Sequence, residues 1–243
     1  MPDLDPEPDP PAATSATDPR RQEPLPERLA RGLRGFGPLW NLSFLIIALG
    51  SAIFTGLGAL LVLLWAYLSN TPLRELGFVR PRNWGRTVLA GLALGVVSKL
   101  AMKSVVMPLL GAPPVNAAFH HLAGDRSAIP GFVFLFVVGA GFGEETLYRG
   151  YLFERFGRLF GAGTRGKVAT VLASTALFAA AHWSGQGLPG PEQAFFTGLL
   201  FAGIFAVTGQ LPLLMIGHAA FDLTAYWLIY NDLETRVAHW FLR

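Results

Sequence analysis

Two adjacent glutamates and an arginine lie inside an otherwise apolar stretch of this 243-residue chain. Glu144, Glu145 and Arg149 belong to the sequence GFGEETLYRG, which covers residues 141–150. A charged side chain at bilayer depth costs at least about 2.5 kcal/mol, so charges this close together imply an ion pair, a wet cavity or chemistry. Glu145 and Arg149 stand four residues apart and can pair on one face of a helix. Glu144 then lacks a partner of its own, which makes it the candidate reactive group.

Two histidines in later apolar segments are the candidates to meet Glu144. His182 ends the sequence LFAAAH, and His218 precedes Asp222 by four residues, so this carboxylate can orient the imidazole ring. If the segments on either side of residues 161–166 form a helical hairpin, Glu144 lies about 18 residues before the turn and His182 about 20 residues after it. A rise of about 1.5 Å per residue then places both at nearly the same depth. His218 is expected to be shallower, and helix tilt has to bring it to the other two.

These four groups, placed together in a pocket of low dielectric, suit hydrolysis by an activated water molecule. Glu144 is the candidate general base, and His182 can hold or share the attacking water. His218, oriented by Asp222, can stabilise the developing oxyanion. The same groups can alternatively bind zinc, since two histidines and a carboxylate form a common catalytic zinc site, although the sequence has no His-Glu-x-x-His motif. The chain has no cysteine, which excludes a thiolate nucleophile and cysteine-based zinc sites.

The composition predicts that membrane helices carry these residues. Hydrophobic residues make up 52% and charged residues 14% of the chain, against about 25% charged residues in a soluble domain. At roughly 20 residues for each crossing, we expect an all-α polytopic transmembrane bundle of about six to seven spans. The net charge of +3 comes from arginines near the ends of the apolar segments, which indicates membrane topology rather than nucleic-acid binding.

The apolar segments follow a tail. Residues 1–34 are rich in proline and begin with many acidic residues, so we predict that they are disordered and that the membrane domain covers residues 35–243. Arginines at the end of the tail favour a cytoplasmic N-terminus of a protein in the cell membrane. Residues 39–68 are long for one span and short for two, and their glycines make a kinked or partly re-entrant course an alternative. A single crossing would separate the basic tail from the basic segments 69–87 and 157–167, so we favour a segment that does not cross once.

Lys99 and Lys103 lie four residues apart in the second apolar segment. Lysines in such a position pair with acidic groups, extend toward the interface, or attract a carboxylate of a substrate. We favour a structural role for both.

Three short motifs occur in order on successive predicted membrane helices. They are Glu-Glu-x-x-x-Arg, Phe-x-x-x-His and His-x-x-x-Asp, formed by Glu144, Glu145, Arg149, Phe178, His182, His218 and Asp222. In this order and setting they resemble the CAAX protease and bacteriocin-processing family of intramembrane endopeptidases, also called the CPBP or Abi family. The resemblance covers about residues 130–230. Leu76-Gly77-Phe78 is similar to a short segment that many members carry after the first apolar block.

The resemblance implies a role for each motif residue. Glu144 and His182 would activate the water, while His218 and residue 222 would face the oxyanion. Eukaryotic-type members have asparagine where this chain has Asp222, and an ionised aspartate would repel an oxyanion, so we assign Asp222 to orienting His218. The supporting residues are Glu145, Arg149 and Phe178.

The resemblance also implies a membrane-associated peptide as the substrate, either a lipidated C-terminus or a peptide leader, with the lipid bilayer as the setting and no nucleic acid. Members have been described both as glutamic proteases and as metalloproteases, so no cofactor is assigned and Zn²⁺ stays an alternative. A second alternative is a membrane scaffold or immunity-type protein that binds a partner through the same cavity without cleaving it. A proton-coupled transporter is disfavoured because the sequence shows no repeated halves.

Overall fold

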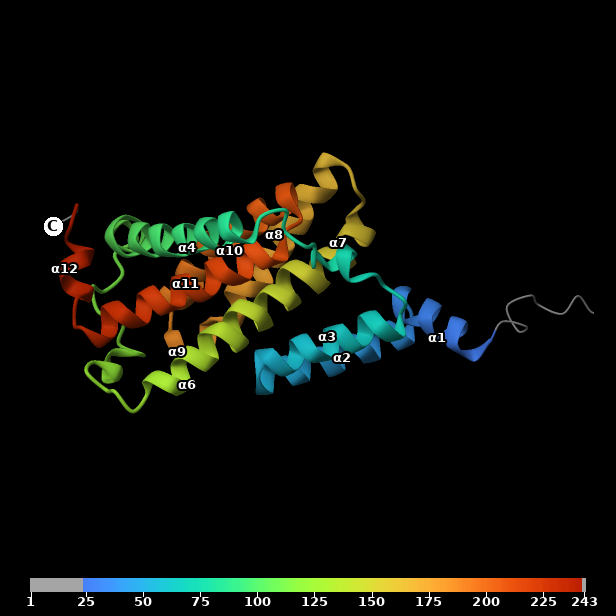
Figure 1. Ribbon diagram of the computed structural model, residues 1–243, viewed down its shortest axis with the longest axis horizontal. Helices are drawn as coiled ribbons and strands as arrows, with labels where there is room; N and C mark the ends of the chain where they lie inside the picture. Colours follow the sequence, from blue (N-terminus) through green and yellow to red (C-terminus); the bar gives the residue numbers. More distant parts are fainter. Residues whose placement is uncertain (1–23, 242–243) are drawn as a thin grey trace, which may run out of the picture.

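The computed structural model describes residues 24–241, and these form helices joined by loops, with no strand among them (Figure 1). The longer helices are α1 (Leu25–Arg34), α2 (Pro38–Ile53), α3 (Thr55–Leu68), α4 (Trp84–Ala101), α6 (Ile129–Phe134), η5 (Leu135–Tyr151), α7 (Leu152–Phe160), α8 (Thr164–Ala181), α10 (Pro189–Thr208) and α11 (Leu211–Tyr230). The short ones are η2 (Leu73–Leu76), η3 (Met102–Val106), α5 (Met107–Leu109), η4 (His120–Leu122), α9 (Trp183–Gln186) and α12 (Glu234–Ala238). The expected all-α fold is confirmed.

Four helices within the described residues are long and apolar enough to cross a membrane, which makes this a multi-pass membrane protein. They are Trp84–Leu109, which combines α4, η3 and α5, then Ile129–Phe160, which combines α6, η5 and α7, and finally α10 and α11. The pair of α1 and α2, bent by 68°, is a candidate for a fifth span. The expected six to seven spans therefore exceed this number. Two helices are not long or apolar enough to count as spans. Helix α3 has only 14 residues, and α8 carries Arg165, Lys167 and several hydroxyl side chains.

The first apolar segment is a helical hairpin broken at Phe54. Helices α2 and α3 lie side by side in Figure 1, and Gly58 permits the close packing because a Cβ there would collide with the side chain of Ser51. The two helices have 16 and 14 residues, which corresponds to about 24 and 21 Å, less than the roughly 30 Å of a hydrocarbon core. The hairpin thus returns the chain to the end of the molecule at which the segment began, as the re-entrant alternative predicts.

The hairpin brings three basic segments to one end of the molecule. Arg34, at the end of α1, pairs with Glu75 at 3.1 Å. Arg158, near the end of α7, pairs with the same carboxylate oxygen at 3.3 Å. Arg155 donates a hydrogen bond to the backbone carbonyl of Arg34 at 2.9 Å. The end of the tail, the loop after α3 and the turn after α7 therefore lie together, which removes the topological conflict that a single crossing would create.

Helix α1 covers part of the segment that we assigned to the tail. The predicted disorder of residues 1–23 lies outside the described residues, whereas residues 25–34 are helical. Trp65 of α3 donates its indole N–H to the carbonyl of Leu33 at 3.3 Å, and both side chains belong to one buried apolar cluster. Packing against the hairpin therefore holds α1 in place.

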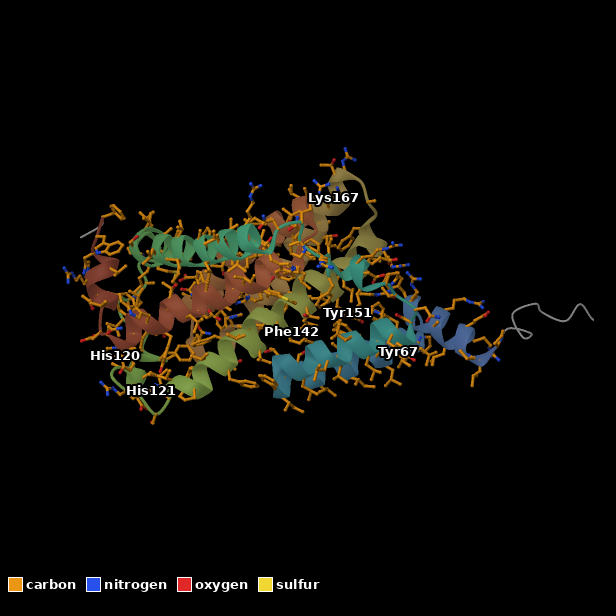
Figure 2. The ribbon with its side chains drawn as sticks, in the orientation of Figure 1. Tyr67, His120, His121, Phe142, Tyr151 and Lys167 are labelled. Atoms are coloured by element: carbon orange, nitrogen blue, oxygen red, sulfur yellow. The ribbon has the colours of Figure 1, made fainter. Side chains whose placement is uncertain are left out.

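Two glycines let helix η5 pack closely between α3 and α11. A Cβ at Gly141 would lie 2.8 Å from the carbonyl oxygen of Met215 on α11. A Cβ at Gly143 would lie 2.6 Å from the backbone carbon of Thr55, at the start of α3. Phe142, between these glycines, lies in the middle of the molecule in Figure 2, far from the ends. Close contact on both sides fixes the part of η5 that carries the two glutamates.

Candidate active site

Helix η5 presents the two glutamates from an unusual helical geometry. Its residues are wound as a π-helix, in which each backbone N–H bonds to the carbonyl five residues earlier. Such turns are rare, occur mostly as short bulges, and are frequent at functional sites. Glu144 and Glu145 lie in the second half of this helix, and as consecutive residues they point in different directions.

Glu145 is the centre of a buried network that joins three helices. Its side chain is 0% exposed, and Oε1 accepts a hydrogen bond from Nη1 of Arg149 at 2.8 Å. The same oxygen lies 2.6 Å from Nδ1 of His218 on α11. Arg149 also donates to the carbonyl of Gly198 on α10 at 3.4 Å. The predicted pair of Glu145 and Arg149 is confirmed, and the same carboxylate oxygen also contacts His218.

The hydrogen-bond partner of His218 is Glu145 rather than Asp222, which corrects the expectation from the sequence. Because Glu145 occupies Nδ1, Nε2 faces the other way, 3.7 Å from Oε2 of Glu144 and 3.8 Å from Oδ2 of Asp222. Both distances are longer than a hydrogen bond. Asp222 lies one helical turn along α11 and approaches the Nε2 edge of the ring, whereas the close packing of η5 on α11 delivers a carboxylate to the Nδ1 edge.

Glu144 differs from its neighbour in that its ion pair with His218 is long, 3.7 Å from Oε2 to Nε2, and is not a hydrogen bond. Its side chain is 18% exposed, and Oε2 forms no hydrogen bond within the part of the chain that the structure describes. A buried carboxylate oxygen without a partner requires an explanation, because nearly all such groups in proteins are satisfied. A water molecule or a substrate group in the adjoining cavity would satisfy it.

His182 and Phe178 complete the wall opposite η5. His182 follows the last residue of α8, and its Nδ1 lies 2.8 Å from the backbone carbonyl of Phe178. With the proton on Nδ1, the ring donates to this carbonyl and Nε2 is left as an acceptor. The ring of Phe178 lies 4.6 Å from that of His182 and 5.9 Å from that of His218, measured between centroids. The guanidinium of Arg149 lies over the same ring at 4.4 Å.

All four predicted catalytic residues line one cavity of about 200 Å³. It lies among η5, α4, α10 and α11, and apolar side chains such as Phe136 and Ile229 form much of its wall. The depths predicted for Glu144 and His182 are therefore compatible with a shared site, and His218 reaches it as well. The individual roles of these residues stay predictions.

Further polar residues of this cavity were missed in the sequence, and two of them share its wall with Lys99. Gln193, near the start of α10, and Asn116, in the loop after α5, line the cavity together with Lys99. The signal for Gln193 was a polar pair, Glu192 and Gln193, at the start of a largely apolar helix. Asn116 lies in a loop, where a polar residue carries no such signal. His120 and His121 lie at one end of the molecule in Figure 2, away from Phe142.

The arrangement of the donor groups argues against a metal site. Within residues 24–241, no three histidine, aspartate or glutamate side chains are grouped so that they could hold a metal ion. One nitrogen of each histidine is already engaged, His182 by a backbone carbonyl and His218 by Glu145. As placed here, the side chains do not fit a zinc centre.

Comparison with known proteins agrees with the motifs. A family model described as "Type II CAAX prenyl endopeptidase Rce1-like" matches residues 126–224, a range that contains all three motifs. The match confirms the resemblance to the CAAX protease and bacteriocin-processing family and supports a CAAX-type intramembrane endopeptidase. No curated protein and no solved structure matches the chain.

Proposed function

Because residues 126–224 form an Rce1-like domain of the CAAX protease family, we propose that this chain is an intramembrane glutamic endopeptidase. Glu144 activates a water molecule that hydrolyses a peptide bond in a membrane-associated peptide. The observation that carries the proposal is the contrast between the two glutamates. Arg149 and His218 both engage Oε1 of the fully buried Glu145, whereas Glu144 lines the cavity and accepts no hydrogen bond from the described chain.

The proposed reaction begins with a water molecule held between Glu144 and Nε2 of His182. Glu144 takes a proton from the water as the oxygen attacks the peptide carbonyl carbon. His218 donates its Nε2 proton toward the developing oxyanion, while its Nδ1 proton stays hydrogen bonded to Glu145. When the tetrahedral intermediate collapses, Glu144 returns the proton to the leaving amine. Asp222, whose Oδ2 lies 3.8 Å from Nε2, takes no part in this step, because an ionised carboxylate would repel the oxyanion.

An apolar groove supports a lipid-linked or hydrophobic substrate. A second cavity, of about 590 Å³, reaches Glu144 and His182 from the side of α2 and α8. Its wall includes Phe44, Ile47 and Leu177, so an acyl or prenyl chain entering from the bilayer would meet apolar side chains. The groove and the cavity of about 200 Å³ share Glu144, and a peptide attached to such a chain would have its backbone at the carboxylate.

The grouping of the basic segments supports a cytoplasmic N-terminus. The end of the tail, the loop around Glu75 and the turn after Arg158 lie at one end of the molecule and are joined by ion pairs. Positively charged short loops favour the cytoplasmic side of a membrane. This end is therefore proposed to face the cytoplasm, with the other end, around Gly124, on the opposite side.

The function is tested by incubating the purified protein with a quenched prenylated peptide and identifying the products by mass spectrometry. Parallel reactions contain a strong chelator, followed by added zinc. Cleavage that survives chelation supports the glutamic mechanism, and cleavage that is lost and restored by zinc would replace it with the metalloprotease. If the protein binds the peptide but leaves it intact, the immunity-type binding protein becomes the better account.

A further inference from the structure

Lys99 is a buried cation in the middle of a membrane span, and no carboxylate in the described chain lies within ion-pair distance of it. Its residue is 7% exposed, and Nζ donates to Oε1 of Gln193 on α10 at 2.9 Å. The ammonium also lies 4.9 Å above the ring of Phe221. One turn further along the same span, Lys103 pairs with Glu234 at 2.7 Å and is neutralised. The two lysines that looked alike in the sequence are thus electrostatically different.

Lys99 lies where the candidate active-site cavity meets a third cavity, distinct from the apolar groove described above. A cavity of about 230 Å³ lies on its other side, toward α12 and the loop after α5. The two cavities share six lining residues, including Lys99, Gln193 and Asn116. A peptide that extends from Glu144 into the cavity of about 230 Å³ would pass these three side chains.

The three side chains offer donors rather than acceptors to the cavities. Oε1 of Gln193 accepts from Lys99, and Oδ1 of Asn116 accepts from the backbone N–H of Ala118 at 3.2 Å. The amide NH₂ groups of both residues form no hydrogen bond within the described residues and remain available as donors. With the ammonium, they make a positively polarised site suited to an anion.

The charge of Lys99 needs compensation that the protein supplies only in part. Burying an ammonium without a paired charge is costly, and intramembrane lysines usually mark a functional partner. Asp222 lines the same cavity and is the rival partner, but it forms no ion pair with Nζ within 4.0 Å in the described chain. A ligand carboxylate between Lys99 and the two amides would provide the missing charge.

We propose that Lys99, with the amides of Gln193 and Asn116, binds a carboxylate of the substrate on the leaving-group side of the scissile bond. The inference rests on the proposed peptidase function and adds a specificity determinant to it. Two sources share this chemistry, the C-terminal carboxylate of the peptide and an acidic side chain close to the cleavage site. An anchored carboxylate would restrict cleavage to bonds at a set distance from it.

Three matched prenylated peptides distinguish these sources. They share one sequence and end in a free carboxylate, in a carboxamide, or in a carboxamide with an aspartate after the cleavage site. Wild type should cleave the free acid about 10- to 100-fold more efficiently in kcat/KM than the plain amide, as expected for charged hydrogen bonds. Lys99→Met should remove this preference, and Lys99→Arg should restore most of it. If the aspartate peptide alone shows the dependence on Lys99, an acidic side chain is the source of the carboxylate.

The matched control removes the charge of Lys103, the lysine that is paired with Glu234. In the double variant Lys103→Met/Glu234→Gln both charges of the neighbouring pair are lost, and the preference for the free acid should persist. Equal cleavage of acid and amide by wild type would overturn the carboxylate site while leaving the peptidase intact. An equal loss of activity on all three peptides in Lys99→Met would also overturn it. That pattern indicates that Lys99 stabilises the carboxylate of Asp222 instead of binding the substrate.

Binding separates a failure of this inference from a failure of the proposed function. The affinity of the detergent-solubilised Glu144→Gln protein for the labelled acid and amide peptides is measured by fluorescence anisotropy. Tighter binding of the acid, lost in Glu144→Gln/Lys99→Met, supports the carboxylate site even if wild type cleaves no peptide. Equal affinities for acid and amide contradict it, whether or not wild type is a protease.

Discussion

Replacing Glu145 with glutamine would remove the charge that holds both Arg149 and His218. Arg149 is 1% exposed, so the variant leaves a buried guanidinium without its counter-charge. Removing one partner of a buried pair costs about 3–5 kcal/mol. At roughly 2–4 °C per kcal/mol for a chain of this length, we expect the Tm to fall by roughly 6–20 °C. Activity should fall as well, because Nδ1 of His218 loses its carboxylate acceptor.

Thermal unfolding of the purified protein in detergent measures the first effect, and peptide cleavage well below the Tm measures the second. The double variant Glu145→Gln/Arg149→Met is the matched control, since it removes both charges and should recover much of the lost stability. Its activity should stay low because His218 still lacks the carboxylate. A single variant as stable as wild type, or a double variant with full activity, would refute the role assigned to the network.

Two further predictions concern packing and topology. Gly143→Leu should lower the Tm and the activity together, because the added side chain begins 2.6 Å from the backbone of Thr55 and would push η5 away from α3. Thermal unfolding measures the change in Tm, and an unchanged Tm would contradict the close approach of the two helices. Because the chain lacks cysteine, single cysteines introduced at Arg82, Gly163 and Gly124 can be labelled in intact cells with a membrane-impermeant maleimide. Only the cysteine at Gly124 should react from outside, and labelling of Arg82→Cys or Gly163→Cys would contradict the proposed orientation.

The site was predictable from the sequence as far as local spacing determines it. The i,i+4 separation predicts the pair of Glu145 and Arg149, which the structure contains, and the helical rise predicts a similar depth for Glu144 and His182. The partner of His218 was not predictable in this way. The spacing favoured Asp222, whereas the observed contact with Glu145 spans 73 positions and depends on how closely two helices pack.

The fold shows the same limit. An apolar composition predicted a helical membrane protein, but hydropathy alone did not distinguish a long span from a hairpin in residues 39–68. The break at Phe54 depends on contacts between α2 and α3, such as that of Gly58 with Ser51. Likewise, Lys99 and Lys103 lie in the same apolar sequence context. Lys103 differs in having an ion-pair partner, Glu234, on a helix that is distant in sequence but close in space.

The proton acceptor is tested most directly by the rate of peptide cleavage in Glu144→Gln, compared with wild type under single-turnover conditions. The amide keeps the shape of the side chain but cannot take a proton from water. We predict a loss of about 100- to 10,000-fold in the cleavage rate, as for removal of a general base, with peptide affinity and Tm close to those of wild type. Cleavage at the wild-type rate would show that Glu144 does not activate the water and would contradict the proposed mechanism.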